Sequence, residues 1–127
     1  MRLLLDTHVY LWVRLDDPAL PVHFRDAIAD PGNLKYVSAI SKAEIAVKRA
    51  VGKLEVDGDI GSDIGVLGLD ELPFTHRHAR TLDALPLNHR DPFDRMLIAQ
   101  AISEDLVFLT VDEACTMYNV RLLSAGP

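Results

Sequence analysis

Short apolar runs alternate with segments of helical periodicity along this chain, and this alternation restricts the fold more than any other feature. Residues 2–5, 35–38 and 106–110 are strand-like runs, and a helical pattern follows each of them. Strands joined through helices run parallel, because each crossover returns the chain to the same end of the sheet. The sequence therefore predicts an α/β fold, a three-layer α/β/α sandwich with a central parallel sheet.

The boundaries of the expected elements follow from proline, glycine and the apolar period. Gly52 closes the third helix, and Pro92 lies in the first turn of the clearest one. A short helix is also expected around 60–66, within the glycine-rich loop 54–68. The expected strands are 2–5, 35–38, 69–72, 106–110 and 120–123, and the expected helices are 7–14, 22–30, 41–51, 75–84, 91–104 and 112–118.

Length and composition limit the class of protein. The chain has 127 residues, so residues 1–127 are expected to form one domain. Its formal charge of −6 argues against a broad basic surface that coats nucleic acid, although it leaves room for a nuclease with catalytic acids. No apolar stretch approaches the length of a membrane span. The single cysteine, Cys115, predicts a reducing, cytoplasmic location and a buried thiol.

Four acidic residues lie at or near the ends of strand-like runs: Asp6, Glu44, Asp94 and Asp112. In a parallel α/β sheet, strand C-termini and helix N-termini share one edge, and ligands bind there. Gathering ionised carboxylates is costly, since two of them about 4 Å apart repel by roughly 4 kcal/mol at an effective dielectric of about 20. A hard divalent cation with oxygen ligands removes that cost, so the pattern predicts a metal site.

Each acid also has a simpler interpretation as a helix cap. Asp6 and Asp112 each precede a helical segment, and Asp91 precedes Pro92 with Asp94 three residues later. Residues 41–44, Ser-Lys-Ala-Glu, have the spacing of a capping box. Capping and metal binding are compatible, because both place a carboxylate at a helix N-terminus on the ligand edge.

Several other polar residues have two interpretations. His89 and Arg90 are either phosphate contacts or solvated loop residues, and Arg95 is either a phosphate contact or a counter-charge to its acidic neighbour. His76 and His78 lack the spacing of a zinc site and are expected at a surface junction between loop and helix.

Four blocks of sequence, in order, resemble PIN-domain ribonucleases. They are Leu-Leu-Leu-Asp-Thr-His at 3–8, Val-Ser-Ala-Ile-Ser-Lys-Ala-Glu-Ile at 37–45, His-Arg-Asp-Pro-Phe-Asp-Arg-Met-Leu-Ile-Ala-Gln-Ala at 89–101 and Leu-Thr-Val-Asp at 109–112. The third block is the most specific and has the form common among VapC-type toxins. The resemblance spans nearly the whole chain.

The resemblance implies a metal-dependent endoribonuclease that hydrolyses RNA phosphodiester bonds and acts as the toxin of a toxin–antitoxin pair. It implies a Mg²⁺ or Mn²⁺ site built from Asp6, Glu44, Asp94 and Asp112. Asp6, Asp94 and Asp112 are the expected direct ligands, Glu44 ligates directly or through a water, and Asp91 is expected to cap or to lie outside the ligand set.

The expected partners are RNA, a VapB-like antitoxin and a second copy of the chain, the last on family grounds alone. An antitoxin arginine can bind two carboxylates at once in the acidic site. The apolar contact is expected in a groove between segments 7–14 and 41–51. Its candidate walls are Trp12, Ile45 and Val51, each of which is alternatively a core residue. Trp12 is alternatively a core residue or a surface on which a base stacks.

Two rival functions are weighed against this one. A PIN-like binding module without activity would not need four intact acids. The second rival is a magnesium-dependent phosphate-handling α/β domain, of which two kinds are considered, and the sequence lacks a residue that each kind would need. A haloacid-dehalogenase-like phosphatase would have a second Asp where His8 stands, and a receiver-type domain would have a Lys beyond a late strand, whereas no Lys follows Lys53.

Overall fold

A four-stranded parallel sheet forms the centre of the computed structural model, which describes residues 1–88 and 91–125. The strand order is β3-β2-β1-β4, and each neighbouring pair is parallel. The parallel α/β fold predicted from the alternation of runs is confirmed. The strands are β1 (Arg2–Leu5), β2 (Leu34–Ser38), β3 (Asp70–Leu72) and β4 (Val107–Leu109).

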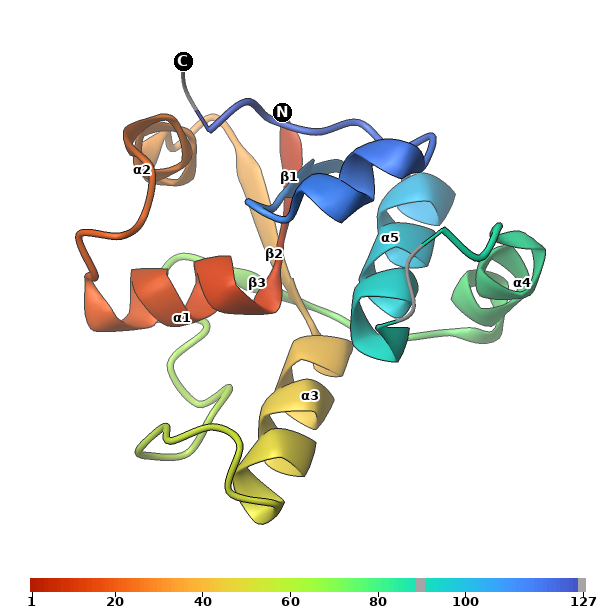
Figure 1. The fold of residues 1–127 in the computed structure, drawn as a ribbon. Coiled ribbons are helices and arrows are strands. Elements are labelled where there is room, and N and C mark those ends of the chain that lie inside the picture. The colour runs from red at the N-terminus through yellow and green to blue at the C-terminus, as the bar shows by residue number, and fades with distance from the viewer. Residues whose placement is uncertain (89–90, 126–127) are drawn as a thin grey trace.

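Helices cover both faces of this sheet. Figure 1 shows α1 and α2 on one side of the strands, α4 and α5 on the other, and α3 extending from the end of β2. The first four helices are α1 (Thr7–Leu15), α2 (Val22–Ala29), α3 (Ala39–Ala50) and α4 (His76–Ala84). They are followed by α5 (Pro92–Glu104) and the short 3-10 helix η1 (Glu113–Met117).

Side-chain alternation along β1 divides the core in two. Leu3 and Leu5 are fully buried with residues of α1 and α2, whereas Leu4 is fully buried with residues of α5. Successive side chains of a strand point to opposite faces, and a parallel sheet is covered on both, which explains the uninterrupted leucines. Ile45 is also fully buried, in the core beneath α1, so of its two predicted roles, groove wall or core residue, the structure shows the core residue.

The third helix begins earlier than expected. Ser38 caps α3 by accepting a hydrogen bond of 2.9 Å from the Ile40 backbone N–H, so Ser41 is not the N-cap. The capping box predicted for residues 41–44 is therefore wrong. Instead Ser41 and Glu44 lie inside the helix and are buried. This register turns Glu44 toward the interior rather than back toward the helix end.

Three other local predictions are wrong. Residues 60–67 form successive turns rather than a helix, and the expected strand at 120–123 is a single bridge between Leu122 and Phe108. His78 is not at the surface: it is 1% exposed, its Nδ1 accepts the Thr75 backbone N–H, and its Nε2 lies 2.8 Å from a Glu104 oxygen. The predictions failed because tertiary contacts override weak local signals.

Two sequence-based expectations about solvent and membrane can also be compared with the structure. Cys115 is buried, as expected, and burial raises the pKa of its thiol to about 12. Within residues 1–88 and 91–125, every helix is too short or too polar to cross a membrane.

Candidate functional site

The four acids singled out in the sequence line one cavity of about 240 Å³ at the C-terminal edge of the sheet. Asp6 ends β1 and caps α1, and Glu44 lies in the second turn of α3. Asp94 lies in the first turn of α5, and Asp112 follows β4 and caps η1. The described residues that line this acidic pocket are Asp6, His8, Glu44, Lys48, Asp91, Asp94, Val111 and Asp112.

Asp6 is fixed by two short hydrogen bonds. Its Oδ1 accepts the Thr7 backbone N–H at 2.6 Å, and its Oδ2 accepts the Thr110 hydroxyl at 2.6 Å. Burial raises the pKa of the Asp6 carboxyl, while the bonds from Thr110 and Thr7 oppose that rise. The carboxylate is therefore oriented before any ligand arrives, at an electrostatic cost that a cation would relieve.

Glu44 is 3% exposed, and both of its oxygens have partners. Oε1 lies 2.6 Å from the Thr7 hydroxyl oxygen, and Oε2 lies 2.5 Å from the Lys48 ammonium nitrogen. The Ser41 hydroxyl oxygen lies 3.0 Å from that of Thr7. Thr7 has one hydroxyl proton, which the carboxylate accepts, leaving Ser41 to donate to the Thr7 oxygen. Glu44 thus joins α1 to α3.

The remaining acids combine capping with access to solvent. Asp91 Oδ1 accepts the backbone N–H groups of Phe93 at 2.9 Å and Asp94 at 3.0 Å, so Asp91 caps α5 as the sequence predicted. Asp112 Oδ1 accepts the Ala114 backbone N–H at 3.0 Å. Asp91, Asp94 and Asp112 are half-buried, so they face the open part of the acidic pocket.

Lys48 is a member of this pocket that sequence reasoning missed. Its ammonium pairs with Glu44, and that hydrogen bond raises the pKa of Lys48, with smaller contributions from Asp91 and Asp94. The available signal was the spacing of four between Glu44 and Lys48, which places both on one helix face. Because Glu44 was already expected in the site, this spacing could have placed Lys48 beside it.

The donor set fits a hard divalent cation. Carboxylate oxygens are the ligands that Mg²⁺ and Mn²⁺ prefer, and here they meet at a sheet edge on a mouth open to solvent. Among the described residues, no three acidic, histidine or cysteine side chains are grouped closely enough to share one ion as they stand. Side-chain rotation by the half-buried aspartates would therefore be part of binding, with Asp6 fixed.

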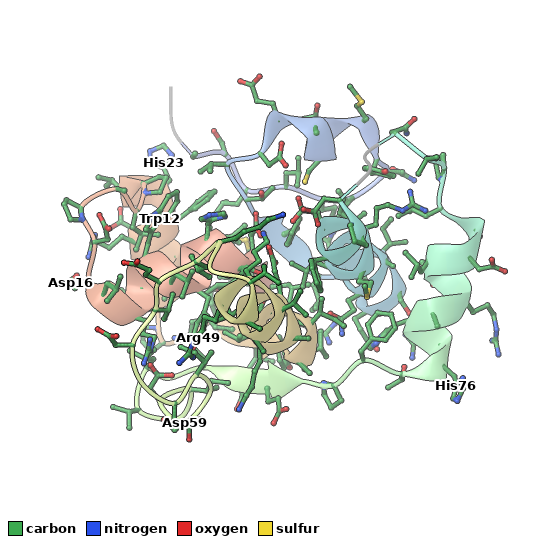
Figure 2. The ribbon with its side chains drawn as sticks, turned by 60° about the horizontal axis from the view of Figure 1, so that its bottom comes forward. Trp12, Asp16, His23, Arg49, Asp59 and His76 are labelled. Atoms are coloured by element: carbon green, nitrogen blue, oxygen red, sulfur yellow. The ribbon has the colours of Figure 1, made fainter. Side chains whose placement is uncertain are left out.

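Other residues named from the sequence lie elsewhere. Arg95 donates to the backbone carbonyls of Pro86 at 2.8 Å and Leu85 at 3.3 Å, which makes it a support for the loop before α5. Trp12, which is labelled in Figure 2, is partly buried against the core beneath α1. Its ring centroid lies 6.3 Å from that of His8. His89 and Arg90 lie outside the described residues.

A second cavity, of about 350 Å³, lies between α3 and the loop that follows it. Its lining is mainly apolar and includes Tyr10, Val37, Ile60 and Ile64, with Glu71 as its one acidic residue among those described. With one carboxylate, this cavity does not offer the ligand set that a divalent cation needs. The smaller acidic pocket is therefore the candidate site.

Comparison with known proteins agrees with the observed fold. The family model described as PIN domain matches residues 3–121. VapBC2 from Rickettsia felis, solved bound to a DNA fragment from its promoter, is similar in structure with a TM-score of 0.72 and 17% identity, over 97% of this chain and 98% of that chain. FitAcB from Neisseria gonorrhoeae has a TM-score of 0.65 and 22% identity, over 97% of each chain. VapBC-1 from nontypeable Haemophilus influenzae has a TM-score of 0.61 and 16% identity, over 98% of each chain. No curated protein matches the sequence significantly.

Proposed function

Because the chain belongs to the PIN-domain family, we propose that it is a metal-dependent endoribonuclease and the toxin of a toxin–antitoxin pair. One observation carries the proposal: carboxylates from four separate segments of the chain line a single pocket at the ligand edge of a parallel sheet. A structural role in capping explains Asp6 and Asp112, but it does not explain why Glu44 is buried beside them.

In this proposal, the role of each acidic residue follows from how deeply its side chain is buried. Asp6, held by Thr7 and Thr110, supplies a fixed ligand at the base of the pocket. Asp94 and Asp112 are half-buried and supply ligands at the mouth, where an RNA backbone can approach. Glu44 contributes charge from behind, through its bonds to Thr7 and Lys48.

Mg²⁺ or Mn²⁺ would supply Lewis acidity, polarising the scissile phosphate and lowering the pKa of the attacking water. Such an ion also offsets the repulsion among the carboxylates, which is the physical reason for assigning it to this pocket. Serving as metal ligands requires the ionised form of these carboxylates.

The test is cleavage of labelled single-stranded RNA by the purified chain, with and without Mg²⁺ or Mn²⁺. Asp94→Asn preserves size and hydrogen bonding but removes one charge, so cleavage should be abolished while the fold survives. Asp26→Asn, at an exposed position in α2, is the matched control and should cleave normally. Full activity of Asp94→Asn, or full activity in excess EDTA, would overturn the proposal and favour an inactive PIN-like binding module.

A VapB-like antitoxin is the proposed partner. Two of the similar structures described above are VapBC complexes by name, which supports a partner of that kind for this fold. The acidic pocket suits an inserted arginine, whose guanidinium can pair with two carboxylates. Val51 is 63% exposed and stays a candidate contact, together with partly buried Trp12.

Coexpression with the protein encoded by the neighbouring gene tests the antitoxin. A stable complex should form and suppress RNA cleavage, and cleavage by that complex at the unbound rate would disprove blockage of the site. On family grounds we also propose a homodimer, which sedimentation of the purified chain would detect. A cytoplasmic location is proposed because the one cysteine is an unpaired, buried thiol.

A further inference from the structure

Lys48 supplies a fixed positive charge within a pocket that is otherwise acidic. Five of the eight described lining residues are carboxylates, and Lys48 is the one permanent cation among them. With His8 neutral, these groups sum to a formal charge of −4. A divalent ion would leave the pocket at about −2, which still repels the backbone of RNA.

A phosphate can therefore enter this pocket only beside a positive centre. A metal ion provides one such centre. The ammonium of Lys48 is the other that the described lining offers. We propose that Lys48 is a substrate-binding residue, whose ammonium contacts a non-bridging oxygen of an RNA phosphate at the acidic pocket. This inference rests on the proposed ribonuclease function and adds a residue to its site.

The Lys48 side chain is placed to do this because Glu44 holds it from behind. Glu44 is 4% exposed at its side chain and Lys48 is 31% exposed, so the pair runs from the interior toward the pocket mouth. Within the described residues, Glu44 provides the only hydrogen bond of the ammonium. An ammonium has three N–H donors, so two remain for a ligand.

A purely structural ion pair would explain the Glu44 contact equally well, since Glu and Lys four residues apart commonly pair on a helix. The two roles differ in what they predict for RNA binding. A structural pair affects the fold and the orientation of Glu44. A phosphate contact also contributes to the salt dependence of RNA binding, because binding a phosphate releases counterions from the strand.

The experiment measures binding of a fluorescein-labelled, mixed-sequence single-stranded RNA by anisotropy over a range of salt concentrations. It uses the Asp94→Asn background, which prevents cleavage. Lys48→Met should weaken binding roughly tenfold, the loss expected for one charged hydrogen bond. The slope of log affinity against log salt should fall by about 0.7, the value for one phosphate contact on a single strand. Lys48→Arg keeps the charge and should keep most of the slope.

Lys42→Met is the matched control. Lys42 lies on the same helix, is 61% exposed and pairs loosely with Asp59 at 3.7 Å, outside the acidic pocket. Figure 2 shows Asp59 on the loop that follows α3, at the edge of the molecule. This substitution removes the same charge from the protein as a whole, so it should leave the slope unchanged if the effect of Lys48 is local.

Measurements of thermal stability and of RNA cleavage distinguish failure of the Lys48 proposal from failure of the proposed function. With Asp94 intact, Lys48→Met should unfold within a few degrees of the wild-type chain, and Mn²⁺ should raise its melting temperature at least as much as that of the wild-type chain, because a competing cation has been removed. An unchanged salt slope, a slope reduced equally by Lys42→Met, or loss of the Mn²⁺ shift would each overturn the role of Lys48. Absence of RNA cleavage by the wild-type chain would instead overturn the proposed function.

Discussion

The hydroxyl of Thr110 donates a 2.6 Å hydrogen bond to Asp6 Oδ2, joining two residues 104 positions apart in the sequence. The same hydroxyl oxygen accepts the Asp112 backbone N–H at 3.1 Å. Thr110 therefore orients one proposed ligand and the backbone of another, at the point where the neighbouring strands β1 and β4 end.

Replacement of Thr110 by Val should impair the site while keeping its shape. Loss of a partner that supports a metal ligand typically costs about 10–100-fold in metal affinity or activity. Burial already raises the pKa of Asp6, and removing this donor should raise it further, so metal binding should require a higher pH. Titrating Mn²⁺ at several pH values measures this effect. Thr116→Val removes an exposed hydroxyl bonded to the Glu113 carbonyl, and it should change neither the affinity for Mn²⁺ nor its dependence on pH.

Divalent metal should stabilise the wild-type fold through the same carboxylates. A ligand at 100 times its dissociation constant adds roughly 2.7 kcal/mol. Asp6→Asn combined with Asp112→Asn should remove this effect, because the caps survive as Asn but the ligand charges do not. Without metal the double variant should equal or exceed the wild type in stability. An equal rise in melting temperature for both proteins would place the ion elsewhere.

Glu104 should make the fold sensitive to acid. The hydrogen bond from His78 holds the pKa of Glu104 below its ordinary 4.5, so the unfolded chain binds more protons in this range and stability rises with pH. The contribution of Glu104 to stability is full above the pKa that this carboxyl has in the unfolded chain. It is lost as the pH falls through the pKa of Glu104 in the folded protein. Glu104→Gln should cost about 1–2 kcal/mol near neutrality and progressively less in acid. Urea unfolding of both proteins across this range measures the difference, with exposed Glu113→Gln as the control.

The hydrogen bonds of the Asp63 side chain should stabilise the loop between α3 and β3. Its two oxygens accept the Tyr10 hydroxyl at 2.8 Å and the Arg14 Nε–H at 2.7 Å. Although burial opposes it, these bonds hold the pKa of Asp63 below its ordinary value, so the anchor persists at neutral pH. Asp63→Asn should lower stability by about 1–2 kcal/mol.

The same substitution should speed proteolysis within residues 54–69, because a loop opens locally when its contacts are lost. Asp59→Asn removes a carboxylate that is 78% exposed on the same loop and should leave the cleavage rate unchanged. Faster proteolysis in both variants would mean that charge on the loop matters, and not the contacts of Asp63. RNA cleavage should persist in both, since neither residue lines the acidic pocket.

Local sequence signals were sufficient to predict the parallel α/β fold. Leu3, Leu4 and Leu5 form a continuous apolar run, which is what a strand covered on both faces requires. Helix starts marked by Asp6, by Asp91 with Pro92, and by Asp112 were also predicted correctly. Capping depends on residues a few positions apart, so it can be read without knowledge of the tertiary structure.

The order of strands and helices also placed the four acids at one edge, because parallel strands all end there. Their common pocket was expected for that reason, and their role as metal ligands stays a prediction. Only the tertiary structure decided how each acid is held. The bond from Thr110 to Asp6 depends on the pairing of β1 with β4, which no local pattern specifies.

Tertiary structure also decided which face of α3 is turned inward. Helix α3 begins at Ala39 rather than Ser41, and its Glu44 and Lys48 both line the acidic pocket. Long-range packing fixes this orientation, because Ile45 is buried in the core while Glu44 meets Thr7. Local propensities differ by a few tenths of a kcal/mol per residue, whereas burying one large apolar side chain contributes about 1.5–3 kcal/mol. The sequence by itself therefore determined the fold class and the edge where the acids meet, and long-range packing determined their partners.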